Sequence, residues 1–359
     1  MRKYYLDNIR WVTIVCVAIY HVFLVYSGVV PTMGTPFSDV QYQDGILYLL
    51  YPWFMILLFI VSGMCSRYYL EDHTTGEFIR SRTRKLLVPS TLGVLLFGWA
   101  PGYINVRNGG HLEEFAQTVP FPVLFLIVTA AGIGVLWFIQ MLWLFSILLV
   151  LVRRYEKGRL YAFTEKTNVI VLILLGIPVW LSGQVLNTPV IVVYRFGIYP
   201  LAFFLGYFVF AHDEVIDRLS KWKHIFIPVA VALGILYVML HFGDNYADMP
   251  VVGSFSAVAY AWIAILAIFG GFKAWGDKTG RISSFMSSKS WGLYIFHNTA
   301  INAMALFLKL YTSFGALPCY ILTMTAAFAG GLAMYEIISR IPFLRFCILG
   351  IKKERADGI

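Results

Sequence analysis

Charged side chains are scarce in this chain. Asp, Glu, Lys and Arg make up 13% of the 359 residues, whereas hydrophobic residues make up 59% and the mean hydropathy is +0.74. A soluble globular domain carries far more charge than this on its surface. The composition therefore predicts a polytopic membrane protein whose main partner is the lipid bilayer.

Cysteine is also rare. Cys16, Cys65, Cys319 and Cys347 are scattered along the chain, without the paired spacing of a zinc site or of a disulfide framework. We therefore expect neither redox chemistry nor a bound metal.

Long apolar stretches are abundant, and ten of them are near the ~20 residues that a helix needs to cross ~30 Å of hydrocarbon. They lie at about 9–29, 46–66, 86–104, 121–152, 168–184, 196–211, 224–242, 252–272, 290–310 and 317–339. We keep 121–152 as one crossing, with 121–133 in the interface or re-entrant. The prediction is an all-α membrane domain over residues 1–359, with about ten transmembrane helices.

The basic residues alternate between the two sides of this predicted bundle. Of the 28 Lys and Arg residues, only Arg107, Arg195 and Lys309 lie in the connections expected outside. Apart from Arg10, the others lie in the N-terminal tail, in every second connection and in a C-terminal segment that includes Lys353 and Arg355. This positive-inside pattern predicts that both termini are cytoplasmic, and it accounts for the net charge of +9 without nucleic acid as a partner.

Two ionisable residues, Arg10 and His21, fall in the first apolar stretch. Eleven residues at ~100° each bring both side chains to one helix face, about 16 Å apart along the axis. This arrangement suits a ligand that is anionic at its cytoplasmic end and reactive near the midplane. Alternatively, Arg10 snorkels or pairs with Asp7, and His21 is a satisfied structural residue.

Three further segments carry polar groups next to predicted spans. In "FIRSRTRKLLVP", Arg82 and Lys85 share a helix face and could hold phosphates, or else anchor the helix at lipid headgroups. In "SSKSWGLYIFHNTAI", Ser290, Tyr294 and His297 share a face, for substrate or for helix contacts. The third segment, "GVLWFIQMLW", contains Trp137, Phe138 and the polar residue Gln140.

Together these segments resemble the acyltransferase-3 family of bacterial membrane enzymes. The residues that match the family's motifs are Arg10 and His21; Phe59, Ser62 and Gly63; Phe78, Arg82, Lys85, Leu86 and Pro89; Leu136, Trp137 and Phe138; and Ser290, Tyr294 and His297. Val135 stands where many members have His, and Lys85 stands where Arg would supply a bidentate fork. The opening "YYLDNIR" is similar to the branch that includes glucan succinyltransferases.

The resemblance implies an enzyme of the bacterial cytoplasmic membrane. It would transfer an acyl group from cytoplasmic acyl-coenzyme A to a hydroxyl of an extracytoplasmic glycan, with acetyl as the first expectation and succinyl as the second. His21 would be the general base or a transient acyl carrier, since a neutral imidazole suits proton removal near neutral pH. Arg10, Arg82 and Lys85 would hold the phosphates of the donor.

Two other classes of protein compete with this interpretation. A secondary transporter or exporter also has many spans and a few buried polar groups, although this sequence has neither an inverted repeat nor acidic residues near the midplane. A structural or sensor module would bind no acyl donor at all.

Overall fold

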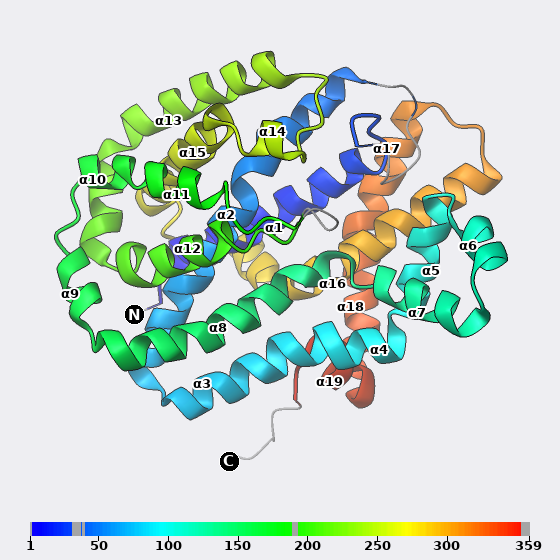
Figure 1. Cartoon of the computed structure of the whole chain (residues 1–359), viewed down its shortest axis with the longest axis horizontal. Helices are drawn as coiled ribbons and strands as arrows, with labels where there is room; N and C mark the ends of the chain where they lie inside the picture. The colour runs from blue at the N-terminus through cyan, green and yellow to red at the C-terminus, as the bar shows by residue number, and fades with distance from the viewer. Residues whose placement is uncertain (1, 31–36, 38–39, 189–192, 353–359) are drawn as a thin grey trace.

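The computed structural model describes residues 2–30, 37, 40–188 and 193–352, so Lys353 and Arg355 lie outside the described residues. Within these ranges the chain is helical, and its only β-type pairing is an isolated bridge between Asn187 and Arg195. Figure 1 shows the helices gathered into one bundle. The all-α prediction is confirmed.

Four helical segments form the centre of the bundle. They are α1 (Tyr4–Leu24), α2 (Gly45–Asp72), α12 (Ile198–Leu205) with the π-helical turn η6 (Gly206–Phe210), and α16 (Arg281–Tyr311). The helix α1 packs against both α2 and α16, and α2 packs on its other side against α12 and η6. The helix α1 therefore packs against other helices on at least two sides.

The remaining helices surround this centre. The long pair α13 (Asp213–His241) and α15 (Phe255–Trp275) packs together along one flank. The other elements are η2 (Tyr42–Asp44), α3 (Thr75–Arg82), η3 (Thr83–Leu87), η4 (Pro89–Gly93), α4 (Val94–Phe97), α5 (Trp99–Asn108), α6 (Leu112–Thr118), α7 (Phe121–Ala131), η5 (Gly134–Leu136), α8 (Trp137–Glu156), α9 (Arg159–Thr164), α10 (Val169–Leu174), α11 (Gly176–Ser182), α14 (Met249–Val252), α17 (Ala316–Thr325), η7 (Ala326–Gly330), α18 (Gly331–Arg340) and α19 (Pro342–Leu349).

Helices cover all ten predicted stretches, but they are not ten uniform spans. In the described part of the chain, six helices are long and apolar enough to cross a membrane by themselves. A seventh would be the helix Thr75–Phe97 together with Trp99–Asn108, which are bent by 74° relative to each other. A multi-pass membrane protein is confirmed, while the count of ten and the cytoplasmic termini stay predictions.

The stretch predicted at 121–152 is divided in the structure. The helix α7 ends at Ala131, a short 3-10 turn follows at Gly134–Leu136, and α8 then begins at Trp137. The helix α7 has only 11 residues and packs against α5. This agrees with one crossing by α8 and with a shorter segment beside it.

A close crossing of two backbones joins α2 to η6. A Cβ atom at Gly63 would lie 2.0 Å from the carbonyl oxygen of Phe203, and a Cβ atom at Gly206 would lie 2.0 Å from that of Ile60. No side chain fits at either position, because the opposing backbone already fills the space. Close packing of the two backbones therefore explains why position 63, in the motif of Phe59, Ser62 and Gly63, is a glycine.

Segments predicted to be cytoplasmic meet at one end of the bundle. Lys3 pairs with Asp213, and the backbone N–H of Tyr5 donates to Asp277 at 3.1 Å. Near the other terminus, Lys289 pairs with Glu336. These contacts link the N-terminal tail to the connections before α13 and α16, as a shared side of the membrane requires.

Candidate functional site

A cavity of about 1060 Å³ opens at the end of the bundle where these segments meet. Its walls come from α1, α2, η3, α8, α16, α18 and the C-terminal segment. The side chains that line it are Arg10, Ile14, Leu58, Val61, Ser62, Arg82, Arg84, Lys85, Leu86, Phe138, Leu142, Ser288, Trp291, Tyr294, Tyr335, Arg345, Leu349, Ile351 and Lys352, together with Gly350. Residues that are far apart in the sequence thus share one space.

The cavity is strongly cationic. Six Lys or Arg side chains line it and, among the described lining residues, there is no Asp or Glu. Among the residues that the structure describes, Arg10 alone of these six cations forms an ion pair with a carboxylate, since its Nη2 donates to Asp7 Oδ1 at 2.7 Å. An excess of fixed positive charge in a concave site favours an anionic ligand that carries several charges.

Two of the cations that precede the third predicted span, Arg84 and Lys85, lie on a π-helical turn. The turn η3 covers Thr83–Leu87, directly after α3, and η4 follows at Pro89–Gly93. A π-helical turn contains more residues than an α-helical turn, so it changes which side chains share a face. Arg84 and Lys85 of this turn line the cavity together with Arg82, the last residue of α3. Arg82 is also anchored by a 3.0 Å hydrogen bond from its Nη2 to Ser66 Oγ.

His21 and His297 lie in contact inside the bundle. The distance from His297 Nε2 to His21 Nδ1 is 3.3 Å, and the ring centroids are 5.0 Å apart. His297 is fully buried, and His21 is partly exposed. Two histidines from α1 and α16 thereby form a dyad.

The hydrogen-bond partners assign the tautomers of this dyad. His21 Nδ1 lies 2.8 Å from the carbonyl oxygen of Val17, and His297 Nδ1 lies 2.9 Å from that of Leu293. A carbonyl oxygen only accepts, so each Nδ1 carries the hydrogen in the neutral ring. His297 Nε2 then accepts from His21 Nδ1, and His21 Nε2 is left as the basic nitrogen of its ring.

The cavity stops short of the dyad. On α1 its lining reaches Ile14 but not His21, and on α16 it reaches Tyr294 but not His297. Tyr294 lines the cavity and its ring centroid lies 6.4 Å from that of His297, so the cavity wall reaches a direct neighbour of the dyad. The structure thus brings Arg10, Arg82, Lys85, Phe138 and Tyr294 to one cavity, with His21 and His297 just beyond its inner end.

The other predicted site residues have separate positions. Trp137 lies outside the cavity wall and packs on Tyr199, with ring centroids 5.7 Å apart. Ser290 is buried and donates to the carbonyl oxygen of Ser287 at 3.3 Å, within its own helix. These two residues therefore support the packing around the cavity and do not line it.

Gln140 and Val135 connect the start of α8 to its neighbours. Gln140 Nε2 donates to the carbonyl oxygen of Ser90 at 2.8 Å, and its Oε1 accepts from the Tyr194 hydroxyl at 2.7 Å. The Tyr294 hydroxyl donates to the backbone carbonyl of Val135. Each of these polar groups is hydrogen-bonded to protein, as buried polar groups should be.

The cavity residues that were not assigned to a site from the sequence include three cations and one tryptophan: Arg84, Arg345, Lys352 and Trp291. Arg345 and Lys352 were counted as part of the basic C-terminal segment, and Arg84 as part of a basic run. Trp291 stands beside Ser290, which shared the predicted face with Tyr294. Its indole donates to the carbonyl oxygen of Leu349 at 3.1 Å and so joins α16 to the C-terminal segment. Nothing local in the sequence indicates that residues 345–352 fold back onto the cavity.

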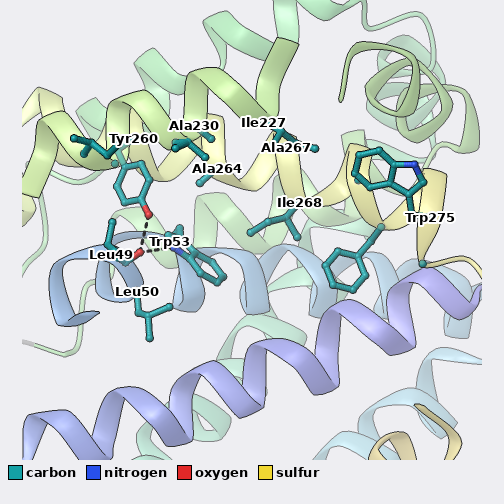
Figure 2. Close-up of a pocket in the computed structure, with 16 residues that line it drawn as sticks. Leu49, Leu50, Trp53, Ile227, Ala230, Tyr260, Ala264, Ala267, Ile268 and Trp275 are labelled. Atoms are coloured by element: carbon teal, nitrogen blue, oxygen red, sulfur yellow. Dashed lines mark hydrogen bonds between the residues drawn. The ribbon is translucent and has the colours of Figure 1, made fainter. Parts of the chain in front are cut away.

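A second hollow has a different character. Figure 2 shows an apolar groove of about 750 Å³ between α2, α13 and α15, with Trp53 near one end and Trp275 near the other. Its described lining contains no ionisable group apart from the Tyr260 hydroxyl, which donates to the carbonyl oxygen of Leu49 at 2.7 Å. The groove therefore presents no charged group that could bind or react with an ionic substrate, whereas the cationic cavity does. The cationic cavity is the candidate site.

Comparison with known proteins agrees with the motifs at this cavity. The family model acyltransferase-3, described as an acyltransferase domain, matches residues 3–336. No solved structure matches the chain. The matched region contains Arg10, Arg82, Lys85 and both histidines of the dyad. This chain therefore belongs to the acyltransferase-3 family, whose members carry out acyl transfer at membranes.

Proposed function

We propose that the protein transfers an acyl group from cytoplasmic acyl-coenzyme A to a hydroxyl of an extracytoplasmic glycan, across the bacterial inner membrane. Acetyl is the first choice of acyl group and succinyl the second. The observation that carries the proposal is the cavity lined by six Lys and Arg side chains, whose lining residue Tyr294 has its ring centroid 6.4 Å from that of His297 in the dyad.

The shape of the donor fits this layout. Coenzyme A has its phosphates at one end and its thioester at the other, joined by a long narrow arm. Arg10, Arg82 and Lys85 would hold phosphates at the mouth of the cavity, while the arm passes Tyr294 toward the dyad. Arg10 and His21 are eleven residues apart on α1, about 16 Å along the axis, and the arm would span this separation.

The dyad supplies the base that the reaction needs. His21 Nε2 would take the proton of the acceptor hydroxyl as its oxygen attacks the thioester carbonyl carbon. The C–O bond forms, the C–S bond breaks, and the thiolate of coenzyme A leaves and is protonated. If the histidine is instead a transient acyl carrier, the same nitrogen attacks first and the acceptor oxygen attacks the acyl-imidazole second.

The test replaces His21 by alanine in the full chain. We expect transfer of labelled acetyl from acetyl-coenzyme A to surface glycans to fall at least about 100-fold, since a general base contributes 10²- to 10⁴-fold. Donor binding should persist, because the cationic cavity does not include His21. The measurements are mass spectrometry of the glycans and calorimetric titration of coenzyme A into the purified protein in nanodiscs.

The control for this experiment is His224→Ala, which removes an exposed histidine beside Trp275. It should retain full transfer. Undiminished acylation by the His21→Ala protein would refute the assigned role. Solute transport with no consumption of acyl donor by the wild-type protein would instead support a transporter.

A further inference from the structure

The C-terminal segment forms one wall of the cationic cavity. Arg345, Leu349, Gly350, Ile351 and Lys352 all line it, although the family match ends at residue 336. Gly350 has φ +65°, and a Cβ atom there would lie 2.3 Å from the carbonyl oxygen of Arg84. This segment therefore lies directly on the backbone of η3, where the cations of the third predicted span are found.

Two arginines from opposite sides of this junction carry unused hydrogen-bond donors. The Nε atoms of Arg84 and Arg345 are buried and, among the described residues, have no hydrogen-bond partner. Arg345 is nevertheless held in place, since its Nη1 donates to the carbonyl oxygen of Ser339 at 3.2 Å. A buried charged donor without an acceptor is costly, and the oxygens of an anion in the cavity would remove that cost.

The charge in the cavity exceeds what a pyrophosphate alone would balance. Six cations line it, and Asp7 offsets one of them through Arg10. A nucleotide pyrophosphate brings two negative charges. A phosphate monoester, whose second pKa is about 6, brings nearly two more at neutral pH. The nucleotide of coenzyme A carries both groups, so its charge comes close to that of the cavity.

We infer that Arg84 and Arg345, which line the same cavity wall as Lys352, form a subsite for the phosphate monoester of the donor nucleotide. The inference rests on the proposed function, because it takes acyl-coenzyme A as the donor. Arg10, Arg82 and Lys85 then serve the pyrophosphate, and the C-terminal segment supplies selectivity for donors that carry the third phosphate. Planar guanidinium groups suit this task, since they bind phosphate oxygens through paired N–H donors.

The experiment compares acetyl-coenzyme A with acetyl-dephospho-coenzyme A, which lacks only the monoester. For the wild-type protein we expect kcat/KM to be about 10- to 100-fold higher for acetyl-coenzyme A than for the dephospho donor. Charged hydrogen bonds to the monoester account for a difference of this size. Arg345→Ala and Arg84→Ala should lower kcat/KM for acetyl-coenzyme A by a similar factor and leave the dephospho donor nearly unchanged. Both variants would therefore lose the preference for acetyl-coenzyme A over acetyl-dephospho-coenzyme A.

The matched control is Arg340→Ala, in the same C-terminal region. Its side chain is 80% exposed and lies outside the cavity lining, so the preference should be unchanged.

Titration with adenosine 3′,5′-bisphosphate gives a readout independent of turnover, and Arg345→Lys tests the geometry without loss of charge. A wild-type protein that uses both donors equally, or an Arg345→Ala protein that loses both to the same extent, overturns the subsite. A wild-type protein that neither binds nor consumes either donor overturns the proposed function and the subsite with it.

Discussion

At the scale of single residues, the hydrogen-bond partners of His21 decide which of its nitrogens could act as the proposed base. The carbonyl oxygen of Val17 and the Nε2 atom of His297 both face His21 Nδ1, at 2.8 and 3.3 Å. Both are acceptors in the assigned tautomers, so the proton stays on Nδ1 and the lone pair on Nε2. His297 is in this sense a positioning residue, which acts through His21.

Replacement of His297 by alanine should therefore lower kcat and leave the donor KM unchanged. We expect a loss of about 10- to 100-fold, which is typical when a supporting hydrogen bond to a functional histidine is removed. His297→Gln should recover part of the activity, since a side-chain carbonyl can accept from His21 Nδ1. Steady-state kinetics over a pH series would show this, with His224→Ala as the control. Equal losses for alanine and glutamine would mean that the ring of His297 only fills space.

Residue spacing along a regular α-helix predicted part of this site. It placed Arg10 and His21 on one face of α1, and it placed Arg82 and Lys85 on a second shared face. Of these four residues, Arg10, Arg82 and Lys85 line the cavity. It failed for Arg84, because the π-helical turn at Thr83–Leu87 changes the angular step between neighbours. It also failed for Arg345, whose position depends on a long-range fold-back of the chain.

At the scale of elements, the crossing of α2 and η6 depends on two glycines. Gly63→Leu should prevent this crossing, because even a Cβ atom would lie 2.0 Å from the carbonyl oxygen of Phe203 and 2.8 Å from the backbone nitrogen of Tyr207. We expect a melting temperature lowered by well over 5 °C or a failure to fold, since backbone atoms cannot move as a flexible side chain can. Thermal unfolding in detergent, followed by size-exclusion chromatography, measures this.

Gly76→Ala is the control for the Gly63→Leu experiment. Gly76 lies inside α3, and nothing lies within 4 Å of the Cβ atom that alanine would add. Alanine is favoured over glycine inside a helix by about 1 kcal/mol, so this variant should be as stable as the wild type or slightly more stable. An equally stable Gly63→Leu protein would show that the two backbones can separate at little cost.

The hydropathy of the sequence did not predict the bends within elements. The apolar stretch 86–104 was predicted as one straight span, but the chain turns by 74° between Phe97 and Trp99. The stretch 121–152 likewise divides before α8. Mean hydropathy reports how apolar a segment is, whereas this bend lies at Gly98, where an added Cβ atom would lie 2.9 Å from the carbonyl oxygen of Thr129 in α7.

At the scale of the whole molecule, the direction in which the cationic cavity opens decides whether the proposed donor, acyl-coenzyme A, could enter it. The charge pattern predicts that the cavity faces the cytoplasm, where acyl-coenzyme A is made. Contacts among Lys3, Asp213 and the connection at Asp277 show that segments assigned to that side do meet. They do not identify the side, because a bundle of the opposite orientation would have the same internal contacts.

Cysteine labelling can determine the orientation. Arg340 is 80% exposed near the cavity end, and Asp244 is 62% exposed in the connection after α13, which is expected outside. In a background with the four native cysteines replaced by alanine, Asp244→Cys should react with a membrane-impermeant maleimide on intact cells. Arg340→Cys should react only in inverted vesicles, because the positive-inside pattern places the C-terminal segment in the cytoplasm. The reverse labelling would place the six cations outside, away from any acyl-coenzyme A, and the cytoplasmic donor would then have to be abandoned.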